Sequence, residues 1–261
     1  TINGIYVHYE AANSVYNRVS IDSNIITNLL NTSKHPGTVT GIYCYGNPPD
    51  NFVTGNRIYN IGAASNSQNN SSISGIHLEL YESSVFNYDT TVVSNNMISL
   101  GYGITNNNEY YGINDKCSGN REINICDNTL YIGGISNGNS NSQVYFHNNI
   151  SGINILNNIF YNERSGGSGN HLCIFIDKGI ITVTNYNMYV SYMSVAAANW
   201  KGSVCGIEQW KTLSGGDKNS YYYTSADALS SSLFTDVVSG ILSIINSNSV
   251  CWYSASKGCP L

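Results

Sequence analysis

The sequence predicts an all-β solenoid in which short parallel strands coil and stack about six times. Three observations support this prediction. An Asn-containing segment recurs five times, a second, glycine-led strand recurs in step with it, and the connections between them are rich in Asn, Ser and Gly. A repeat of this length calls for a solenoid before any other architecture is considered.

Each copy of the Asn segment has an apolar residue, two spacers, an Asn, one spacer and a second apolar residue, as in residues 154–160. The period-two pattern and the many Ile, Val, Thr and Tyr residues indicate strands rather than helices. We therefore expect each copy to form a strand, a bend at the Asn and a second strand. The Asn residues are separated by 32, 40, 32 and 30 positions: Asn24, Asn56, Asn96, Asn128 and Asn158.

A third strand lies between the Asn copies and begins with glycine in its first four copies. The glycines, Gly4, Gly41, Gly75 and Gly112, are spaced by 37, 34 and 37 residues, so this row advances in step with the Asn row. Residues 143–147 and 171–175 continue the row without the glycine. Three strands per turn therefore describe a coiled parallel sheet.

These repeats resemble those of right-handed parallel β-helix proteins, the pectate-lyase-like superfold. The resemblance covers residues 1–190 and rests on the repeated Asn bend. It implies that equivalent side chains stack from coil to coil, so that the five Asn residues form a ladder that satisfies its own amides. Residues 191–261 look like the tail that closes the last coil in many secreted bacterial proteins of this type.

The two ends of the repeat give further expectations. Tyr186 is expected at the bend position of the last coil, and a short helix within 196–209 is expected to carry Trp210 onto its open end. No capping segment precedes Gly4, and an open coil end exposes strand edges. We therefore expect either end-to-end self-association or a partner that covers the first coil.

Composition limits the functional classes. Only 10% of the 261 residues are charged, yet no apolar run approaches the length of a membrane-spanning helix. The formal charge of −5 and the lack of a basic stripe argue against nucleic acid as a partner.

The chain has seven cysteines, an odd count. We expect Cys44 and Cys173 to be buried thiols, and the spacings of Cys117 with Cys126 and of Cys251 with Cys259 suit loop-closing disulfides. No cysteine pair has metal-ligand spacing. This usage favours an extracellular or cell-surface location.

The glycine-led row is the place where a binding surface is predicted. Alternate side chains of a strand point to opposite faces, so Val144 and Phe146 are expected to point inward with the other apolar residues. The expected outward strip combines aromatic rings with polar groups, a combination suited to sugars or flat protein surfaces. Alternatively, stacked Tyr residues merely stabilise the sheet. The strip comprises Tyr6, His8, Glu10, Tyr43, Tyr45, His77, Glu79, Tyr81, Asn114, Lys116, Tyr145 and His147.

The acid/base candidates are His77, Glu79 and Lys116, because Glu79 could orient His77 or raise its pKa, with Lys116 one coil on. The resemblance implies a Lys or Arg base with clustered acids that hold calcium, or several Asp residues in the related hydrolases. Here the strip offers only Glu10, Glu79 and Glu82, too few for a clear calcium site. Asp115 falls at an inward position, so either the strand has ended or the acid points into a turn.

The sequence therefore favours a structural or adhesive module, without a cofactor, that uses the strip to bind a glycan or a partner chain. The alternative is a polysaccharide lyase or glycoside hydrolase that acts in the same groove, for which calcium would be the expected cofactor.

Overall fold

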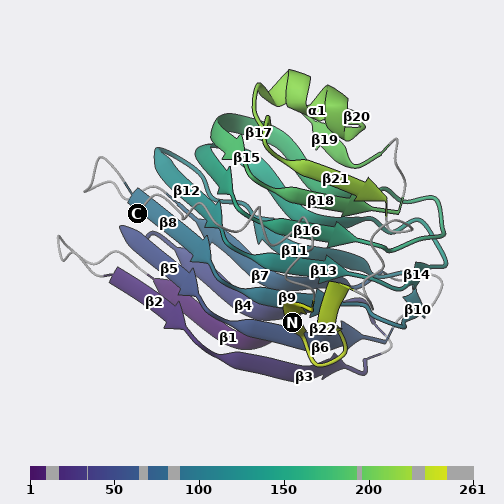
Figure 1. Cartoon of the computed structure of the whole chain (residues 1–261). Helices are drawn as coiled ribbons and strands as arrows, with labels where there is room; N and C mark the ends of the chain where they lie inside the picture. Colours follow the sequence, from purple (N-terminus) through teal and green to yellow (C-terminus); the bar gives the residue numbers. More distant parts are fainter. Residues whose placement is uncertain are drawn as a thin grey trace.

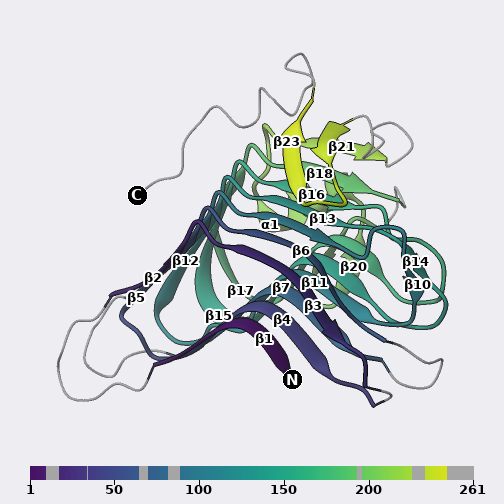
Figure 2. The same ribbon diagram turned by 90° about the horizontal axis from the view of Figure 1, so that it is seen from below.

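The chain folds as a parallel β-solenoid of about six turns, consistent with the right-handed parallel β-helix. The computed structural model describes residues 1–9, 18–33, 35–64, 70–81, 89–192, 196–224 and 233–245. Figure 1 shows the coils stacked in sequence order, and Figure 2 shows one coil beneath the next with a sharp bend along one edge. The predicted fold class is confirmed.

Three rows of strands build the solenoid. The glycine row contains β1 (Ile2–Tyr9), β4 (Thr38–Gly46), β7 (Ser72–Leu80), β11 (Glu109–Asp115), the first parts of β15 (Ser142–Leu156) and β17 (His171–Asn185), and β19 (Ala198–Trp200). The pre-bend row contains β2 (Arg18–Asp22), β5 (Asp50–Thr54), β8 (Asp89–Ser94), β12 (Arg121–Cys126) and the second parts of β15 and β17.

The post-bend row forms a separate seven-stranded sheet. Its strands are β3 (Ile25–Asn31), β6 (Arg57–Ala63), β9 (Met97–Leu100), β13 (Thr129–Ile132), β16 (Ile159–Asn162), β18 (Met188–Ser191) and β21 (Tyr221–Thr224). Two short strands, β10 (Thr105–Asn106) and β14 (Ile135–Ser136), pair in the connections back to the glycine row. Apolar side chains from all three rows fill the interior of the coil.

The predicted Asn ladder runs along the bend. The Oδ1 atom of Asn128 accepts hydrogen bonds from the backbone N and the Nδ2 of Asn96, at 3.1 and 3.0 Å, and the same pattern joins each rung to the next. The residue before each ladder Asn has a left-handed backbone, for example Asp127 with φ 58°. The bend therefore lies one residue earlier than predicted. Tyr186 is this left-handed residue in the last coil, and Asn187 is a sixth rung.

The repeated glycines mark a close approach between two rows. A Cβ atom on Gly41 would lie 2.7 Å from Cγ2 of Ile58 in the post-bend row and 2.6 Å from the carbonyl oxygen of Gly75 in the next coil. Only a residue without a side chain fits there, because packed interiors do not leave room for such contacts.

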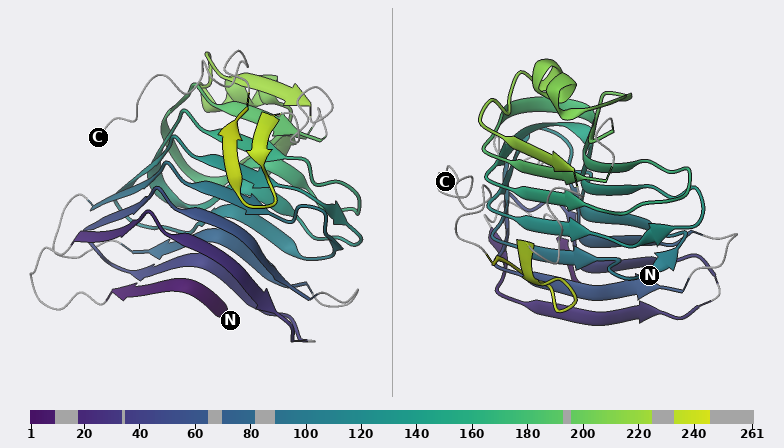
Figure 3. Two further views of the ribbon diagram at one scale, coloured as in Figure 1. Left: turned by 60° about the horizontal axis from the view of Figure 1, so that its bottom comes forward. Right: turned by 45° about the vertical axis from the view of Figure 1, so that its right-hand side comes forward.

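Residues 198–224 cover one end of the stack, opposite β1–β3 (Figure 3). The predicted helix exists but begins later, as α1 (Ile207–Ser214), because β19 and β20 (Ser203–Cys205) form a hairpin before it. Trp210 is buried against Trp200, with ring centroids 5.6 Å apart. β21 lies beyond residue 190 but continues the post-bend row. The strand pairing therefore does not separate a solenoid from a tail at residue 190, and that division stays a prediction.

A second hairpin, β22 (Phe234–Asp236) and β23 (Ile241–Ile244), packs on the outer face of the post-bend row. Phe234 contacts the rings of Tyr131 and Tyr161 there.

Among the described cysteines, four are free and buried: Cys44, Cys117, Cys173 and Cys205. The burial predicted for Cys44 and Cys173 is therefore confirmed. The disulfide between Cys117 and Cys126 was a wrong prediction, because the thiol of Cys117 packs in the core instead. Cys251 and Cys259 lie outside the described residues.

Candidate functional site

The first three coils of the glycine row carry a continuous surface of aromatic rings. Strand register places Tyr6 beside Tyr43 and Tyr43 beside His77, while His8 lies beside Tyr45. The ring centroids are 5.2 Å apart for Tyr6 and Tyr43, 4.7 Å for Tyr43 and His77, and 5.0 Å for His8 and Tyr45. The rings contact one another along the solenoid axis, and Tyr6 at the first coil exposes 51% of its surface. These residues, with Glu79, Tyr81 and Lys116, are called the Tyr/His strip below.

Glu79 is the polar centre of the Tyr/His strip. Its Oε2 accepts a hydrogen bond from the hydroxyl of Tyr43 and its Oε1 one from the hydroxyl of Tyr81, both at 2.7 Å. Burial alone would raise the pKa of Glu79, but these hydrogen bonds, the neighbouring imidazole of His77 and the charge of Lys116 bring it below its usual range. The carboxylate is therefore ionised at neutral pH and fixes two rings in place.

His77 is neutral in this site. Burial and the positive charge of Lys116 lower the pKa of His77 to about 4, although Glu79 acts in the opposite direction. Glu79 therefore acts in the predicted direction, but burial and Lys116 outweigh it and the net pKa is lowered. Nδ1 of His77 lies 3.5 Å from the amide nitrogen of Asn114, which assigns the proton to Nε2, 3.7 Å from Oε2 of Glu79.

Lys116 follows Asp115 at the end of β11 and is exposed. The register of β11 on β7 brings it beside Glu79, one coil on, as predicted. Its charge lowers the pKa values of both His77 and Glu79.

Three predicted members of the strip are buried: Tyr145, His147 and Asn114, which keeps the outward register beside His77 but is only 4% exposed. Tyr145 pairs with Ile113 and His147 pairs with Asp115, so both point into the core and are fully buried. Val144 takes the place of the glycine in that coil. A shift of one residue in register moves every side chain of a strand to the other face.

The outward positions of the later coils belong to phenylalanines, which the sequence reasoning missed. Phe146 lies beside Asn114 in register, and its ring contacts those of Tyr111 and Phe175, with centroids 5.4 and 5.0 Å away. If Val144 is aligned with the glycines of the earlier coils, Phe146 takes an outward position and Tyr145 an inward one. Glu10 and Glu82 lie outside the described residues.

Tyr145, His147 and Asp115 form a polar cluster inside the solenoid. Oδ2 of Asp115 accepts hydrogen bonds from the hydroxyl of Tyr145 at 2.8 Å and from Nδ1 of His147 at 2.9 Å, while Oδ1 accepts one from the backbone N of Cys117 at 3.0 Å. Asp115 is the last residue of β11, still within the strand, and its carboxyl group points into the core. This cluster has no exposed member and stabilises the core.

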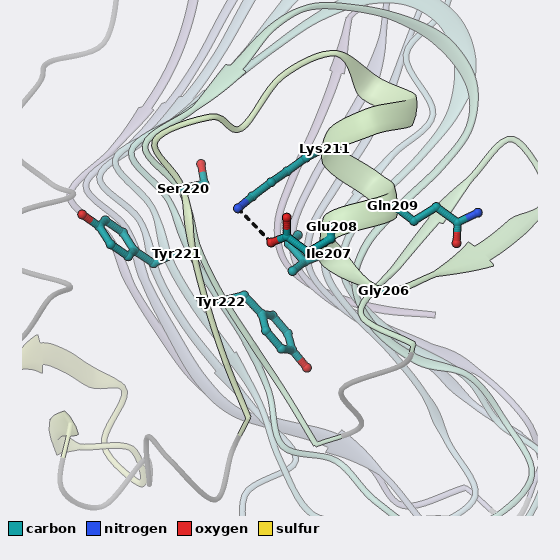
Figure 4. A pocket seen from close by; sticks show the side chains of 8 residues that line it. All are labelled: Gly206, Ile207, Glu208, Gln209, Lys211, Ser220, Tyr221 and Tyr222. Atoms are coloured by element: carbon teal, nitrogen blue, oxygen red, sulfur yellow. Dashed lines mark hydrogen bonds and ion pairs between the residues drawn. The ribbon is translucent and has the colours of Figure 1, made fainter.

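The pocket drawn in Figure 4 lies away from the strip, between α1 and β21. It has a volume of about 610 Å³, and the ammonium group of Lys211 lies 3.1 Å from the carboxylate of exposed Glu208 at its edge. None of the predicted site residues lines it.

In the part of the chain that the structure describes, no group of three or more His, Cys, Asp or Glu side chains is placed to hold a metal ion. None of the helices in those ranges is long and apolar enough to cross a membrane. Comparisons with family models, curated proteins and solved structures found no match to this chain.

Proposed function

We propose that the protein is an adhesive module that binds an extended, neutral glycan along the Tyr/His strip. One observation carries this proposal: several aromatic rings with hydrogen-bonding tips lie in contact on one outer face of the solenoid, and two of their hydroxyls are fixed by Glu79. Rings that present both apolar edges and hydroxyls suit sugars, which offer C–H surfaces and hydroxyls together.

The charges of the strip favour a neutral glycan. Among its described residues, Glu79 and Lys116 are a single acid and a single base side by side, and His77 is neutral at physiological pH. A polyanionic glycan would need a run of cations, and a polycation would need a run of acids. The strip has neither, so hydroxyl and ring contacts are left to supply the affinity.

The strip is also shaped for an elongated ligand. Equivalent residues of successive parallel strands are separated by about 4.8 Å, and the rings follow the solenoid axis from Tyr6 to His77. The phenylalanines of the later coils extend the same outward column. A chain of sugars can therefore lie along the axis and contact one ring after another.

The polysaccharide lyase or hydrolase alternative is less well supported by the electrostatics. A general base works best with a pKa near the working pH, whereas the pKa of His77 is about 4. Glu79 is ionised and occupied by two hydroxyls, which suits a positioning group better than a proton donor.

The direct test is to measure the binding of soluble neutral polysaccharides by affinity electrophoresis. We expect a Tyr43→Ala/Tyr45→Ala variant to bind roughly tenfold more weakly, or worse, because contacts at the centre of an interface dominate its energy. Tyr192→Ala, at an exposed tyrosine away from the strip, is the matched control and should bind as the wild type does. Equal affinity of the two variants would refute the strip as the binding surface.

The same protein preparations test the alternative that the protein is a polysaccharide lyase. Incubation with uronate-containing polysaccharides, with and without calcium, should give no unsaturated-product absorbance. Product formation that disappears in Lys116→Ala would establish the lyase instead.

We also propose an extracellular or cell-surface location, because extended glycans of the kind proposed for the strip are found there. Detection of the protein in the culture medium or on intact cells by antibody would support it. Confinement to the soluble cell interior would contradict it.

A partner at the first coil is proposed as well. β1, β2 and β3 end their sheets in the described chain, inward-facing Ile5 and Val7 are only partly buried, and Oδ1 of Asn24 accepts no hydrogen bond from the described residues. Strands from outside residues 2–31 could pair with these edges. Light scattering should then show mass that grows with concentration, whereas a monodisperse monomer at high concentration would argue against self-association.

A further inference from the structure

A second surface, on the outer face of the post-bend row, combines a groove with unusual backbone. Two adjoining pockets of about 260 and 220 Å³ lie there, between the turn of the β22–β23 hairpin and the segment after β9. They share Asn60, Ile61 and Ile104, and so form one groove. Small-ligand sites usually have volumes of about 300–1,000 Å³, a range that the two pockets reach only together.

Two asparagines in this groove have left-handed backbones in the middle of strands. Asn28 has φ 59° and Asn60 has φ 50°, and they occupy equivalent places in β3 and β6. Glycine would adopt this conformation without steric cost, yet an amide stands at both positions. Strained backbone that recurs beside a pocket is a reason to suspect a function.

The amides of this pair leave polar groups available in the groove. Nδ2 of Asn60 donates to Oδ1 of Asn28. Among the described residues, Nδ2 of Asn28 and Oδ1 of Asn60 then have no hydrogen-bond partner, so one donor and one acceptor remain side by side. Both side chains are exposed, which lets a ligand reach them.

Aromatic and aliphatic groups form the rest of the groove. Tyr59 is backed by Gly240 of the hairpin turn, where an added Cβ would lie 2.8 Å from the Cβ of Tyr59. Tyr102 is 44% exposed, and Leu30 and Val238 expose 60% and 59% of their surface. A patch of this kind, with polar groups at its centre, is typical of a binding site rather than of solvated surface.

Among the described residues, none that carries a charge lines either pocket. An ionic ligand would lose its hydration without gaining a counter-charge. Although the guanidinium of Arg57 lies 5.5 Å from the centroid of the Tyr59 ring, the lining favours a neutral ligand, with apolar faces for the rings and hydroxyl or amide groups for the asparagines. A pyranose sugar has this combination.

We infer that the groove formed by Asn28, Asn60, Tyr59 and Tyr102 is a second binding site, which takes one or two units of a neutral saccharide. It lies on a different row of strands from the Tyr/His strip and does not depend on the strip's function. Two such sites on one rigid solenoid would allow the module to hold two glycan chains, or two parts of one chain, with the gain in avidity that linked sites provide.

The test uses saturation-transfer NMR of the full chain with cellotetraose, maltotetraose and mannotetraose, and with an uncharged acetylated and amidated tetrapeptide. It is done in the Tyr43→Ala/Tyr45→Ala background, so that the strip does not contribute. We expect one tetrasaccharide to bind. Addition of Asn28→Gly and Asn60→Gly should weaken this binding by at least about tenfold.

Glycine is the matched substitution because it keeps the left-handed backbone and removes only the amides. Unchanged thermal unfolding would show that both variants remain folded. Loss of binding in the glycine variant supports the inference. Binding that survives the substitution, binding of the peptide alone, or no binding of any tetrasaccharide would overturn it. If wild type and strip variant bind equally while the glycine variant does not, the strip proposal fails and the groove proposal stands.

Discussion

Asp115 is an acid at a core position, and its neighbours explain why it is tolerated there. All of its partners donate hydrogen bonds: the Tyr145 hydroxyl, Nδ1 of His147 and the backbone N of Cys117. The other ring nitrogen of His147 lies 2.7 Å from the carbonyl oxygen of Asn149. Because both ring nitrogens face acceptors, both must carry protons. The core therefore contains an imidazolium–carboxylate pair.

Removal of one member of this pair should be far more damaging than removal of a hydrogen bond to it. Asp115→Asn leaves the buried imidazolium without its carboxylate, and we expect a loss of about 3–5 kcal/mol in the free energy of unfolding. Tyr145→Phe, the control, removes one hydroxyl and should cost about 1 kcal/mol. Urea denaturation measures both. Similar losses in the two variants would contradict the charged pair.

The pair also gives stability a dependence on pH. Burial lowers the pKa of His147, but the charge and hydrogen bond of Asp115 outweigh it, so that the pKa is raised above 6.5. This stabilisation is complete below pH 6.5 and is lost as the pH rises through the raised value. Burial raises the pKa of Asp115, but His147 lowers it by more, so the net pKa of Asp115 is below 3.8. The stability that the Asp115 carboxylate contributes is therefore lost as the pH falls through this lowered pKa.

We therefore expect the stability difference between wild type and His147→Gln to be largest in the weakly acidic range and to shrink in alkali. Denaturation midpoints measured from about pH 5 to about pH 10 test this. A difference that stays constant over the range would show that His147 is not charged in the folded protein.

For individual residues, the sequence predicted the outward face of a strand correctly where a glycine marks the register and wrongly where the glycine is missing. Tyr6, Tyr43 and His77 follow repeated glycines, and they lie on the predicted face. Tyr145 and His147 come from a coil in which Val144 replaces glycine, and the register was set one residue wrong. The buried pair was missed for the same reason.

The Asn ladder is the element that joins one coil to the next. Nδ2 of buried Asn128 donates to the carbonyl oxygens of Val93 and Cys126 and to Oδ1 of Asn158. Its own Oδ1 accepts from two nitrogens of Asn96. Loss of this side chain leaves several buried groups without partners at once.

We expect the cost of removing a rung to depend on its place in the ladder. Asn128→Ala should lower the free energy of unfolding by about 2–4 kcal/mol, because the orphaned groups are buried. Asn24→Ala, at the half-buried first rung, should cost about 1 kcal/mol, since water can replace its partners. Equal losses in chemical denaturation would contradict this dependence on burial.

Asp217 ends the ladder at the capped end. Its carboxyl group accepts hydrogen bonds from Asn187 Nδ2, Tyr189 OH and Trp210 Nε1, at 3.0, 2.9 and 2.7 Å, and further ones from Thr184 and Ser220. A carboxylate can only accept, so the ladder stops there. The same group therefore holds α1 on the last coil.

Substitution of Asp217 should loosen the cap. In Asp217→Ala, we expect a loss of at least about 3 kcal/mol and a red-shifted emission of Trp210, whose indole N–H loses its partner. Glu208→Ala, at an exposed ion pair on α1, should change stability by at most about 1 kcal/mol and leave the emission unchanged. An unshifted spectrum in Asp217→Ala would contradict this role.

The elements themselves were largely predictable, because strands, bends and row spacing follow from a repeated local pattern. The exceptions are at the end of the repeat. Tyr186 was taken for a ladder position, although Asn187 next to it continues the row. The start of α1 was missed since the β19–β20 hairpin depends on pairing with β17.

For the whole molecule, stacking of one coil type makes both the fold and its surface continuous along an axis. Any side chain repeated at one register position becomes a row on the outside, which is how a few Tyr and His residues become the Tyr/His strip. The stacking was predictable from spacing alone. The electrostatics of the strip were not, since they depend on the depth of His77 and on the hydroxyls that reach Glu79.

The groove at Asn28 and Asn60 could not have been predicted either. It requires the β22–β23 hairpin, far along the chain, to fold back beside Tyr59. Its left-handed asparagines have no signature in the repeat, whose bends lie elsewhere.

Binding of a neutral glycan along the strip is tested most directly by hydroxyl-radical footprinting with mass spectrometry, because tyrosine side chains oxidise readily when exposed. With bound polysaccharide, we predict slower oxidation of Tyr6 and Tyr81, which are 51% and 38% exposed, and no change at Tyr192. Tyr102 reports separately on the groove. Unprotected Tyr6 and Tyr81 in the presence of bound polysaccharide would contradict the proposed function.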